Sequence, residues 1–157
     1  MKSFVLFFAI ASLSNLISAQ REIEGFELLG PVPSLGRSTS NLYYYISTES
    51  VAWSVAFKSC VDQGGQLATP SNPLLDEALR QYMVTAGDYA WVGGKSVGTT
   101  WRWQTTNEPF TYKMIPVNTP NCNVADSCLH VGHAIDTLAW FWCGFNCSQA
   151  RKYVCEF

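Results

Sequence analysis

The stretch Trp91-Val92-Gly93-Gly94 decides how the rest of the chain is interpreted, because it is an uncharged, core-forming segment in the middle of 157 residues. A Trp-Val pair is typical of a buried β-strand, and two consecutive glycines let other backbone segments approach closely. Trp101 and Trp103 follow soon after and alternate with polar residues, as expected of a half-buried strand. Three tryptophans so close together predict the centre of a hydrophobic core.

Composition indicates one globular domain and argues against a nucleic-acid partner. The chain is 48% hydrophobic and 14% charged, with a formal net charge of -2. A nucleic-acid-binding domain needs clustered basic residues, and the sequence has no basic or acidic run. No linker, repeat or low-complexity tract divides the chain, so we expect a single folded unit.

The first residues are typical of a secretory signal peptide. Met1-Lys2 supplies a positive start, residues 4–13 are almost wholly apolar, and Ala19 is a small residue suited to cleavage. The apolar run is shorter than the roughly 20 residues that span a bilayer, so we expect no membrane insertion. We predict that residues 1–19 are removed and that the mature chain is secreted and extracellular. Residues 20–41 carry few signals and are expected to form an extended N-terminal arm.

An even number of cysteines in a secreted chain predicts three disulfides. All six lie in the mature part: Cys60, Cys122, Cys128, Cys143, Cys147 and Cys155. Their spacing alone leaves the pairing open. A zinc site at Cys143 and Cys147 is the alternative, but no second close pair of Cys or His accompanies it.

The order of expected elements predicts an α+β fold. Tyr43-Tyr44-Tyr45-Ile46 favours a strand, and apolar residues then recur at helical spacing until Gly64-Gly65: Val51, Trp53, Ala56, Phe57, Cys60 and Val61. A second helical stripe consists of Leu74, Leu75, Ala78, Leu79, Tyr82 and Met83. Short strands and long loops follow from Tyr89. We therefore expect two helices flanking small antiparallel sheets, with a long loop region and disulfide staples.

Taken together, these motifs resemble the C-type lectin-like domain. They are the helix that carries Cys60, then Gly65-Gln66-Leu67-Ala68, Trp91-Val92-Gly93-Gly94, Glu108-Pro109, and the closing cysteines Cys128, Cys147 and Cys155. The resemblance covers the chain from Tyr43 to Phe157 and predicts a domain over residues 42–157, similar to short secreted C-type lectins of the arthropod type. It implies the pairs Cys60–Cys155 and Cys128–Cys147. Cys122 and Cys143 are then left over, and their simplest partner is each other.

The resemblance also implies a calcium and sugar site in the loop region, residues 105–147. Calcium takes about 6–8 oxygen ligands. Glu108 and Pro109 match the first two positions of the family's Glu-Pro-Asn motif, where a cis bond before the proline is common, and Asp126 falls where the family often has another acidic ligand. Phe110 stands at the third position and has no side-chain oxygen.

The second ligand motif of the family, Trp-Asn-Asp, is also altered. Trp142 matches its tryptophan, and Cys143 and Gly144 then replace the two oxygen donors. Alignment on Trp140 gives no better match. We therefore expect a degenerate site, with Glu108 and Asp126 as residual ligands that bind calcium weakly or not at all. We hypothesise that a Cys122–Cys143 disulfide fixes the loop in place of the metal.

The candidate ligand-binding residues are Glu108, Pro109, Phe110, Asp126, Trp140 and Trp142. Family membership implies that the partners are glycans or glycoproteins, often on microbial or viral surfaces in innate defence. The alternative is a calcium-independent protein-binding module of the same fold, in which exposed aromatics form the contact. The aromatic and Met side chains of this half are Tyr112, Met114, Trp140, Phe141, Trp142 and Phe145.

Three further motifs carry weaker expectations. His130 and His133 would face opposite sides of a strand and so would not form a metal pair. The sequence lacks a local nucleophile signature, so we expect neither catalytic residues nor an enzyme. Asn146-Cys147-Ser148 is formally a glycosylation sequon, but we expect poor occupancy because a bonded central cysteine lies close to the chain.

Overall fold

The computed structural model describes residues 22–34, 41–86, 89–112, 122, 125–133 and 139–157. The expected signal peptide and Met114 lie outside these residues. The elements are β1 (Phe26–Pro31), β2 (Tyr43–Ser47), α1 (Trp53–Asp62), β3 (Gln66–Leu67), α2 (Pro73–Ala86), β4 (Ala90–Val97), β5 (Thr100–Trp103), β6 (Cys128–His133), β7 (Trp140–Phe145) and β8 (Lys152–Glu156). In the described part of the chain, neither helix is long and apolar enough to cross a membrane.

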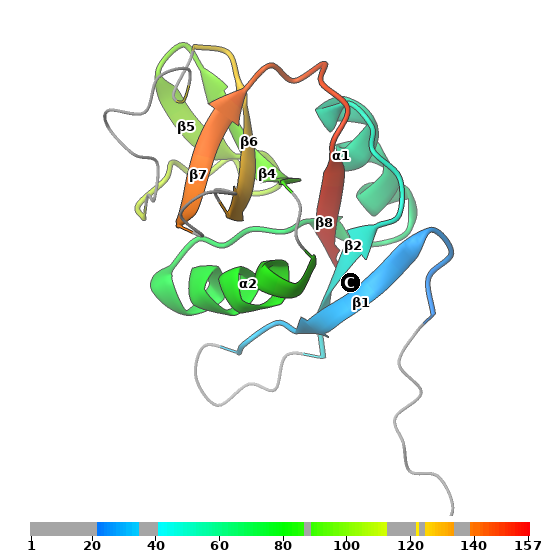
Figure 1. Ribbon diagram of the computed structural model, residues 1–157. Coiled ribbons are helices and arrows are strands. Elements are labelled where there is room, and N and C mark those ends of the chain that lie inside the picture. The colour runs from blue at the N-terminus through cyan, green and yellow to red at the C-terminus, as the bar shows by residue number, and fades with distance from the viewer. Residues whose placement is uncertain (1–21, 35–40, 87–88, 113–121, 123–124, 134–138) are drawn as a thin grey trace, which may run out of the picture.

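The strands join into one mixed sheet with two helices (Figure 1). Its order is β1-β2-β8-β4-β6-β7, with β3 paired to β8 and β5 paired to β4. β4 and β8 run parallel, whereas the other pairs are antiparallel. The predicted α+β fold is confirmed. The expected small sheets are continuous because β8 pairs with β2 on one side and with β4 on the other.

The described part of the N-terminal arm is an edge strand of the sheet. β1 pairs with β2 from Phe26 opposite Ser47 to Pro31 opposite Tyr43. A proline is tolerated on an edge strand because its missing N–H removes no ladder bond. A Cβ atom at Gly30 would lie 2.3 Å from the Tyr82 ring of α2, so glycine is required for this close packing.

The Trp91-Val92-Gly93-Gly94 stretch lies at the centre of the core, as predicted. Trp91 packs in the cluster that faces α1, and Val92 packs in the cluster that faces α2, because successive strand residues point to opposite faces. Both side chains are fully buried. A Cβ at Gly93 would lie 3.2 Å from a backbone oxygen, and one at Gly94 would lie 2.7 Å from the Phe110 ring. The two glycines therefore permit the close approach expected of them.

The inward faces of the helices differ from the predicted stripes at three positions. Val61 and Leu74 are 48% and 47% exposed. Asp76 is buried instead, with 4% exposure, alongside Leu79 and Met83. Residues 76, 79 and 83 share one helical face, so the sheet-facing stripe of α2 begins with a carboxylate rather than with Leu74.

Three disulfides join distant parts of the fold. Cys60–Cys155 ties α1 to β8, Cys128–Cys147 ties β6 to the segment after β7, and Cys122–Cys143 ties the loop to β7. Cys60–Cys155 and Cys128–Cys147 are the pairs that the family resemblance implied, and Cys122–Cys143 is the pair expected of the two cysteines left over. Because Cys143 and Cys147 are bonded to different partners, the zinc alternative is wrong.

Candidate functional site

A buried carboxylate in the first turn of α2 faces the loop region. The side-chain oxygen of Asn72 accepts the backbone N–H groups of Leu74 and Leu75 at 3.0 and 3.1 Å, which caps the helix. This start places Asp76 in the first turn, where the helix dipole favours a negative charge. The capped helix thereby directs a charge into the apolar space between α2 and β7.

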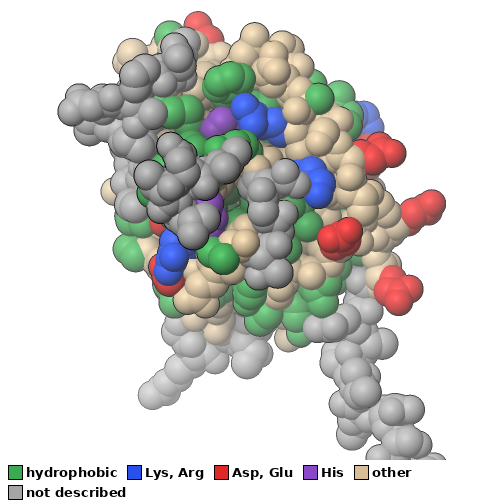
Figure 2. Space-filling view, in the orientation of Figure 1, with side chains coloured by type: hydrophobic (Ala, Val, Ile, Leu, Met, Phe, Trp, Pro, Cys, Tyr) green, Lys and Arg blue, Asp and Glu red, His purple; other side chains and the backbone are tan. Residues whose placement is uncertain are grey.

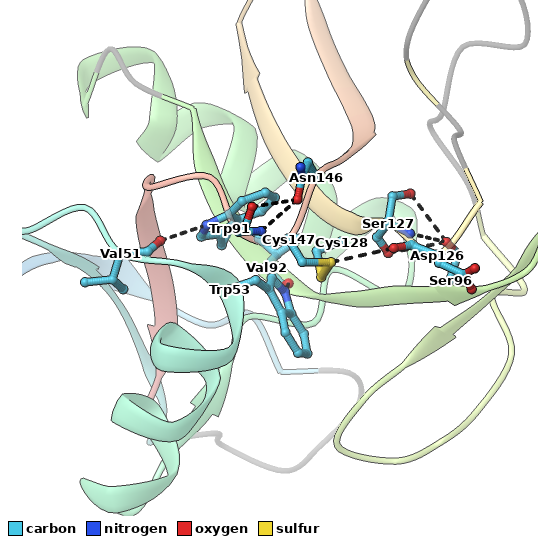
Figure 3. Close-up of a disulfide and its surroundings, with 11 residues drawn as sticks. Val51, Trp53, Trp91, Val92, Ser96, Asp126, Ser127, Cys128, Asn146 and Cys147 are labelled. Atoms are coloured by element: carbon cyan, nitrogen blue, oxygen red, sulfur yellow. Dashed lines mark hydrogen bonds between the residues drawn. A yellow bond between two sulfur atoms is a disulfide. The ribbon is translucent and has the colours of Figure 1, made fainter.

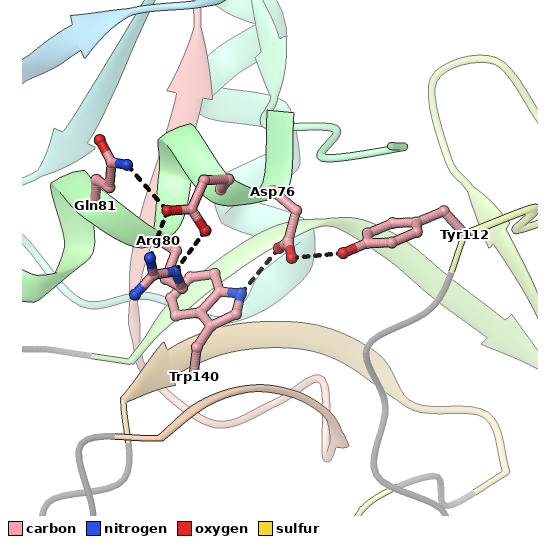
Figure 4. Close-up of polar contacts among 6 residues, drawn as sticks. Asp76, Arg80, Gln81, Tyr112 and Trp140 are labelled. Atoms are coloured by element: carbon pink, nitrogen blue, oxygen red, sulfur yellow. Dashed lines mark hydrogen bonds and ion pairs between the residues drawn. The ribbon is translucent and has the colours of Figure 1, made fainter. Parts of the chain in front are cut away.

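Three aromatic donors satisfy Asp76, and two of them, Tyr112 and Trp140, are drawn in Figure 4. The indole N–H groups of Trp140 and Trp142 donate to Oδ1 at 2.9 and 2.8 Å, and the Tyr112 hydroxyl donates to Oδ2 at 2.9 Å. In Figure 4, Tyr112 and Trp140 point toward the carboxylate from two sides. Burial, together with the hydrogen bond to Asp76, raises the pKa of Tyr112 to about 12. We call Asp76, Tyr112, Trp140 and Trp142 the Asp76 cluster.

Asp76 was not among the residues predicted from the sequence, although both tryptophans that bind it were. The available signal was an acidic residue spaced three and seven positions before Leu79 and Met83, within an apolar stripe. A carboxylate on the inward face of a helix requires partners. Those partners lie 36, 64 and 66 residues away along the chain.

Phe110 and Trp142, two predicted ligand-binding residues, lie in the core. Phe110 is 9% exposed and Trp142 is fully buried. The Phe110 ring centroid lies 5.7 Å from that of Trp101, 4.1 Å from Trp103 and 5.8 Å from Trp142. This corrects the expectation that they contact a ligand: Phe110 fills the space above Gly94, and neither ring offers a free face.

Glu108 and Asp126, the predicted calcium ligands, lie at opposite ends of β5. Asp126 lies beside the β4–β5 turn, where its Oδ1 accepts the Gly98 N–H at 2.9 Å. The Glu108 carbonyl accepts the Trp103 N–H at 2.9 Å, at the other end of the strand. The four residues of β5 separate these places by about 10 Å, whereas ligands of one calcium ion lie within about 2.6 Å of it. The two residues are therefore anchored at opposite ends of this strand rather than side by side.

Positions 143 and 144, which correspond to the family's second ligand motif, cannot supply side-chain oxygen donors. Cys143 is bonded to Cys122 and is 5% exposed. A Cβ at Gly144 would lie 2.5 Å from Ser127 Oγ and 2.6 Å from the Trp101 ring, so no longer side chain fits there without displacing them. Among the residues that the structure describes, no group of three or more His, Cys, Asp or Glu could hold a metal ion. These residues do not fit the calcium site that the resemblance implies.

The peptide bond before Pro109 is trans, as are all peptide bonds in the described ranges. This corrects the expected cis bond. Pro109 is exposed and bridges to Arg102 of β5 in an antiparallel pair, so the loop returns along β5 in extended form.

The family model of the lectin C-type domain matches residues 49–157. The chain belongs to the C-type lectin domain family. The matched range contains both helices, all three disulfides and the whole Asp76 cluster. Domains of this family typically serve as non-enzymatic binding modules.

Both lectins and ice-structuring proteins resemble this C-type lectin domain. The type-2 ice-structuring protein of Brachyopsis segaliensis is 28% identical over 114 residues, which cover 71% of this chain. The chain spans 64% of the length of that relative. A calcium-independent type II antifreeze protein superposes with a TM-score of 0.62 at 19% identity, over 87% of this chain and 94% of its own.

A third similar structure is the C-type lectin domain of murine dendritic cell inhibitory receptor 2 in complex with N-glycan. It gives a TM-score of 0.65 at 16% identity, over 87% of this chain and 98% of its own. At these identities the two solved structures establish the fold alone.

The Asp76 cluster of this C-type lectin domain reaches the surface through Tyr112 and Trp140, which are half-buried. The His133 ring lies 5.1 Å from Trp140. Burial and the positive charge of Arg80 lower the pKa of His133 below its ordinary value. Arg80 is itself paired with Glu77. Figure 2 shows histidine side chains at the surface in this view, with hydrophobic and Lys or Arg side chains near them.

The other face of β6 and β7 carries a separate aromatic group around His130 and Arg151. The Arg151 guanidinium lies 5.6, 5.5 and 4.8 Å from the ring centroids of Tyr89, Trp91 and Phe145. Burial and the charge of Arg151 lower the pKa of His130 to about 3. His130 packs with Trp91, whereas His133 packs with Trp140. The two histidines thus lie on opposite faces, as the sequence predicted.

Proposed function

We propose that this domain recognises glycans or glycoproteins outside the cell without calcium at the family's usual position. The observation that carries the proposal is that neither position 143 nor position 144 supplies a side-chain oxygen for calcium. Cys143 is used in a disulfide, and Gly144 lies against Trp101 with no space for a carboxylate. The separation of Glu108 from Asp126 supports the same conclusion.

In this proposal, covalent and aromatic contacts hold the loop where other family members use a metal. Cys122–Cys143 joins the loop to β7, and Tyr112 binds Asp76 of α2. A disulfide restrains the chain irrespective of free calcium. The domain would therefore keep its binding surface in solutions that contain a chelator.

An extracellular location is part of the proposal. Three disulfides in a small domain favour an oxidising compartment. The N-terminal sequence supports removal of residues 1–19 during secretion. A role in recognition of microbial or viral surfaces rests on family membership and is the biological setting that we propose.

We place the ligand at the surface formed by Tyr112 and Trp140. Each indole or phenol has one edge fixed by Asp76 and part of its ring exposed. A fixed aromatic face binds the apolar C–H face of a sugar ring with little loss of side-chain entropy. The N-glycan complex of a structurally similar lectin domain supports this ligand class.

Glycan-array binding of the oxidised protein, in calcium and in chelator, tests the proposal. We expect signals that agree within about twofold between the two conditions, and a loss of about tenfold or more for Trp140→Ala. Phe141→Ala is the matched control, because Phe141 is the next residue of β7, is also half-buried, and faces the other side. Glycan binding that chelator abolishes, or equal binding of both variants, would contradict the proposal.

A calcium-independent protein-binding module is the second candidate. Tyr and Trp with exposed faces are enriched at protein interfaces, so the same surface suits a protein ligand. Retention of a glycoprotein ligand after enzymatic deglycosylation would favour this candidate over sugar recognition. Because relatives include ice-structuring proteins, thermal hysteresis of the same preparation tests ice as a third ligand.

A further inference from the structure

The glycosylation sequon at Asn146 lies at an exposed turn. Asn146-Cys147-Ser148 is the one Asn-x-Ser/Thr sequence in the chain that lacks proline at its centre. Asn146 and Ser148 are exposed and directly follow β7. The Gln149 N–H donates to the Asn146 carbonyl at 3.1 Å, which closes the turn. We expected poor occupancy because the central cysteine is bonded, and Cys147 is indeed bonded to Cys128. The residue that would be modified, Asn146, is nevertheless exposed.

The turn fixes the central cysteine, whereas its two neighbours, Asn146 and Ser148, are exposed. Figure 3 shows Asn146 next to the Cys128–Cys147 disulfide. Cys147 is bonded to Cys128, and its carbonyl accepts the Trp53 N–H at 2.9 Å. The Asn146 Oδ1 accepts both the N–H and the hydroxyl of Ser148, at 3.0 and 2.9 Å. These bonds use the oxygen of the carboxamide, and its nitrogen lies on the opposite side of Cγ. A sugar on that nitrogen would leave both the disulfide and the turn intact.

We propose that Asn146 carries an N-linked glycan. The Asn146 Nδ2 atom forms a bond to C1 of the first sugar of an oligosaccharide that is linked to a lipid pyrophosphate. The C1–O bond to the pyrophosphate breaks, the lipid pyrophosphate leaves, and the amide nitrogen gives up one proton. This inference rests on the secretory route of the proposed function.

Disulfide formation limits the time available for this reaction. Cys128 precedes Cys147 by 19 residues, so it is synthesised first and can bond Cys147 soon after the sequon enters the oxidising compartment. Once Cys147 is bonded and the turn is closed, the sequon is held in one conformation. Glycan occupancy at Asn146 should therefore depend on the hydroxyl residue of the sequon. A sequon with threonine is modified faster than one with serine, so we expect higher occupancy with threonine at position 148.

The position of the glycan is compatible with the proposed ligand surface. Asn146 follows the last residue of β7, and Trp140 is the first. Five residue steps along the strand separate Trp140 from Phe145 by about 17 Å. The glycan would shield the end of β7 near Phe145 and Arg151 and leave the Tyr112–Trp140 surface open.

Mass spectrometry of the full chain, secreted from a eukaryotic cell line, tests the inference. Peptide N-glycosidase in ¹⁸O-water should lower the intact mass and convert Asn146 to labelled Asp. Asn146→Gln and Ser148→Ala should abolish the mass change, and Ser148→Thr should keep or increase it. Wild-type and Ser148→Thr proteins in the medium that both lack the label at Asn146 would overturn the proposal.

A second version of the chain tests glycosylation of Asn146 independently of the predicted signal peptide. Residues 1–19 are replaced by an established secretory leader, so the domain enters the same compartment whatever its own N-terminus does. A labelled Asn146 in this version supports the glycan, and its absence overturns it. Retention of the natural chain inside the cell, when the substituted chain is secreted, would instead refute the predicted signal peptide.

Discussion

Removal of the Asp76 carboxylate is the perturbation that tests the structural account of the loop most sharply. Asp76→Ala deletes the acceptor of three hydrogen bonds, from Tyr112, Trp140 and Trp142. Tyr112 and Trp140 are half-buried and can rotate toward water, but Trp142 is fully buried. A buried donor left without a partner costs about 1–3 kcal/mol. With about 0.5–1.5 kcal/mol for each of the other two bonds, we expect a loss of about 2–6 kcal/mol in the free energy of unfolding.

The control is Asp76→Asn, which keeps the shape of the side chain but removes its negative charge and replaces one oxygen by nitrogen. Its Oδ1 can still accept both indole N–H groups, and its Nδ2 can donate to the Tyr112 hydroxyl oxygen. We therefore expect Asp76→Asn to lose less than half of the stability that Asp76→Ala loses. Urea denaturation, followed by tryptophan fluorescence with the disulfides intact, measures both values.

An Asp76→Ala protein within about 1 kcal/mol of the wild type would refute this reasoning. Equal losses for the alanine and asparagine variants would also contradict it, because the charge rather than the acceptor positions would then carry the stability. If the proposed ligand surface is right, Asp76→Ala should in addition weaken ligand binding under conditions where the variant remains folded.

Further predictions concern the core and the disulfide. The His130 pKa of about 3 lies below its ordinary 6.5, so the unfolded chain takes up the proton first, and the stability present above pH 6.5 falls as the pH drops. Urea denaturation should show a loss of about 2 kcal/mol in the free energy of unfolding between pH 7.5 and 5. The variant His130→Phe should reduce this pH dependence. Replacing Cys122 and Cys143 together with serine should cost about 3 kcal/mol for a loop of this length, and addition of calcium should not restore the thermal midpoint. Gly144→Ala should cost about 1–3 kcal/mol through overpacking, and an increase in its melting temperature would contradict the reported contacts.

The centre of the fold could be predicted from the sequence because its determinants are local. The strand propensity of Trp91-Val92 and the close approach at Gly93-Gly94 are properties of neighbouring residues. The two helices followed from apolar periodicity. The edge strand β1 was expected only as an extended arm, because its burial depends on β2 and on the Tyr82 ring rather than on its own pattern.

The candidate site was predictable in part, since burial in a loop region is decided by distant partners. Phe110 was chosen for its place in a ligand motif, but its environment consists of Trp101, Trp103 and Trp142. Asp76 was missed because its three donors come from other elements. The family resemblance supplied two of the disulfide pairs, which the cysteine spacing alone left open, and the third joined the two cysteines left over.

Calcium titration of the oxidised mature chain by calorimetry, with glycan binding measured in calcium and in chelator, tests the central claim most directly. We predict no calcium-binding heat with a Kd tighter than about 1 mM, within the range of weak extracellular calcium sites, and ligand binding that chelator leaves unchanged. A tighter calcium Kd, together with ligand binding that chelator removes, would contradict the account. It would require oxygen ligands in the loop other than positions 143 and 144.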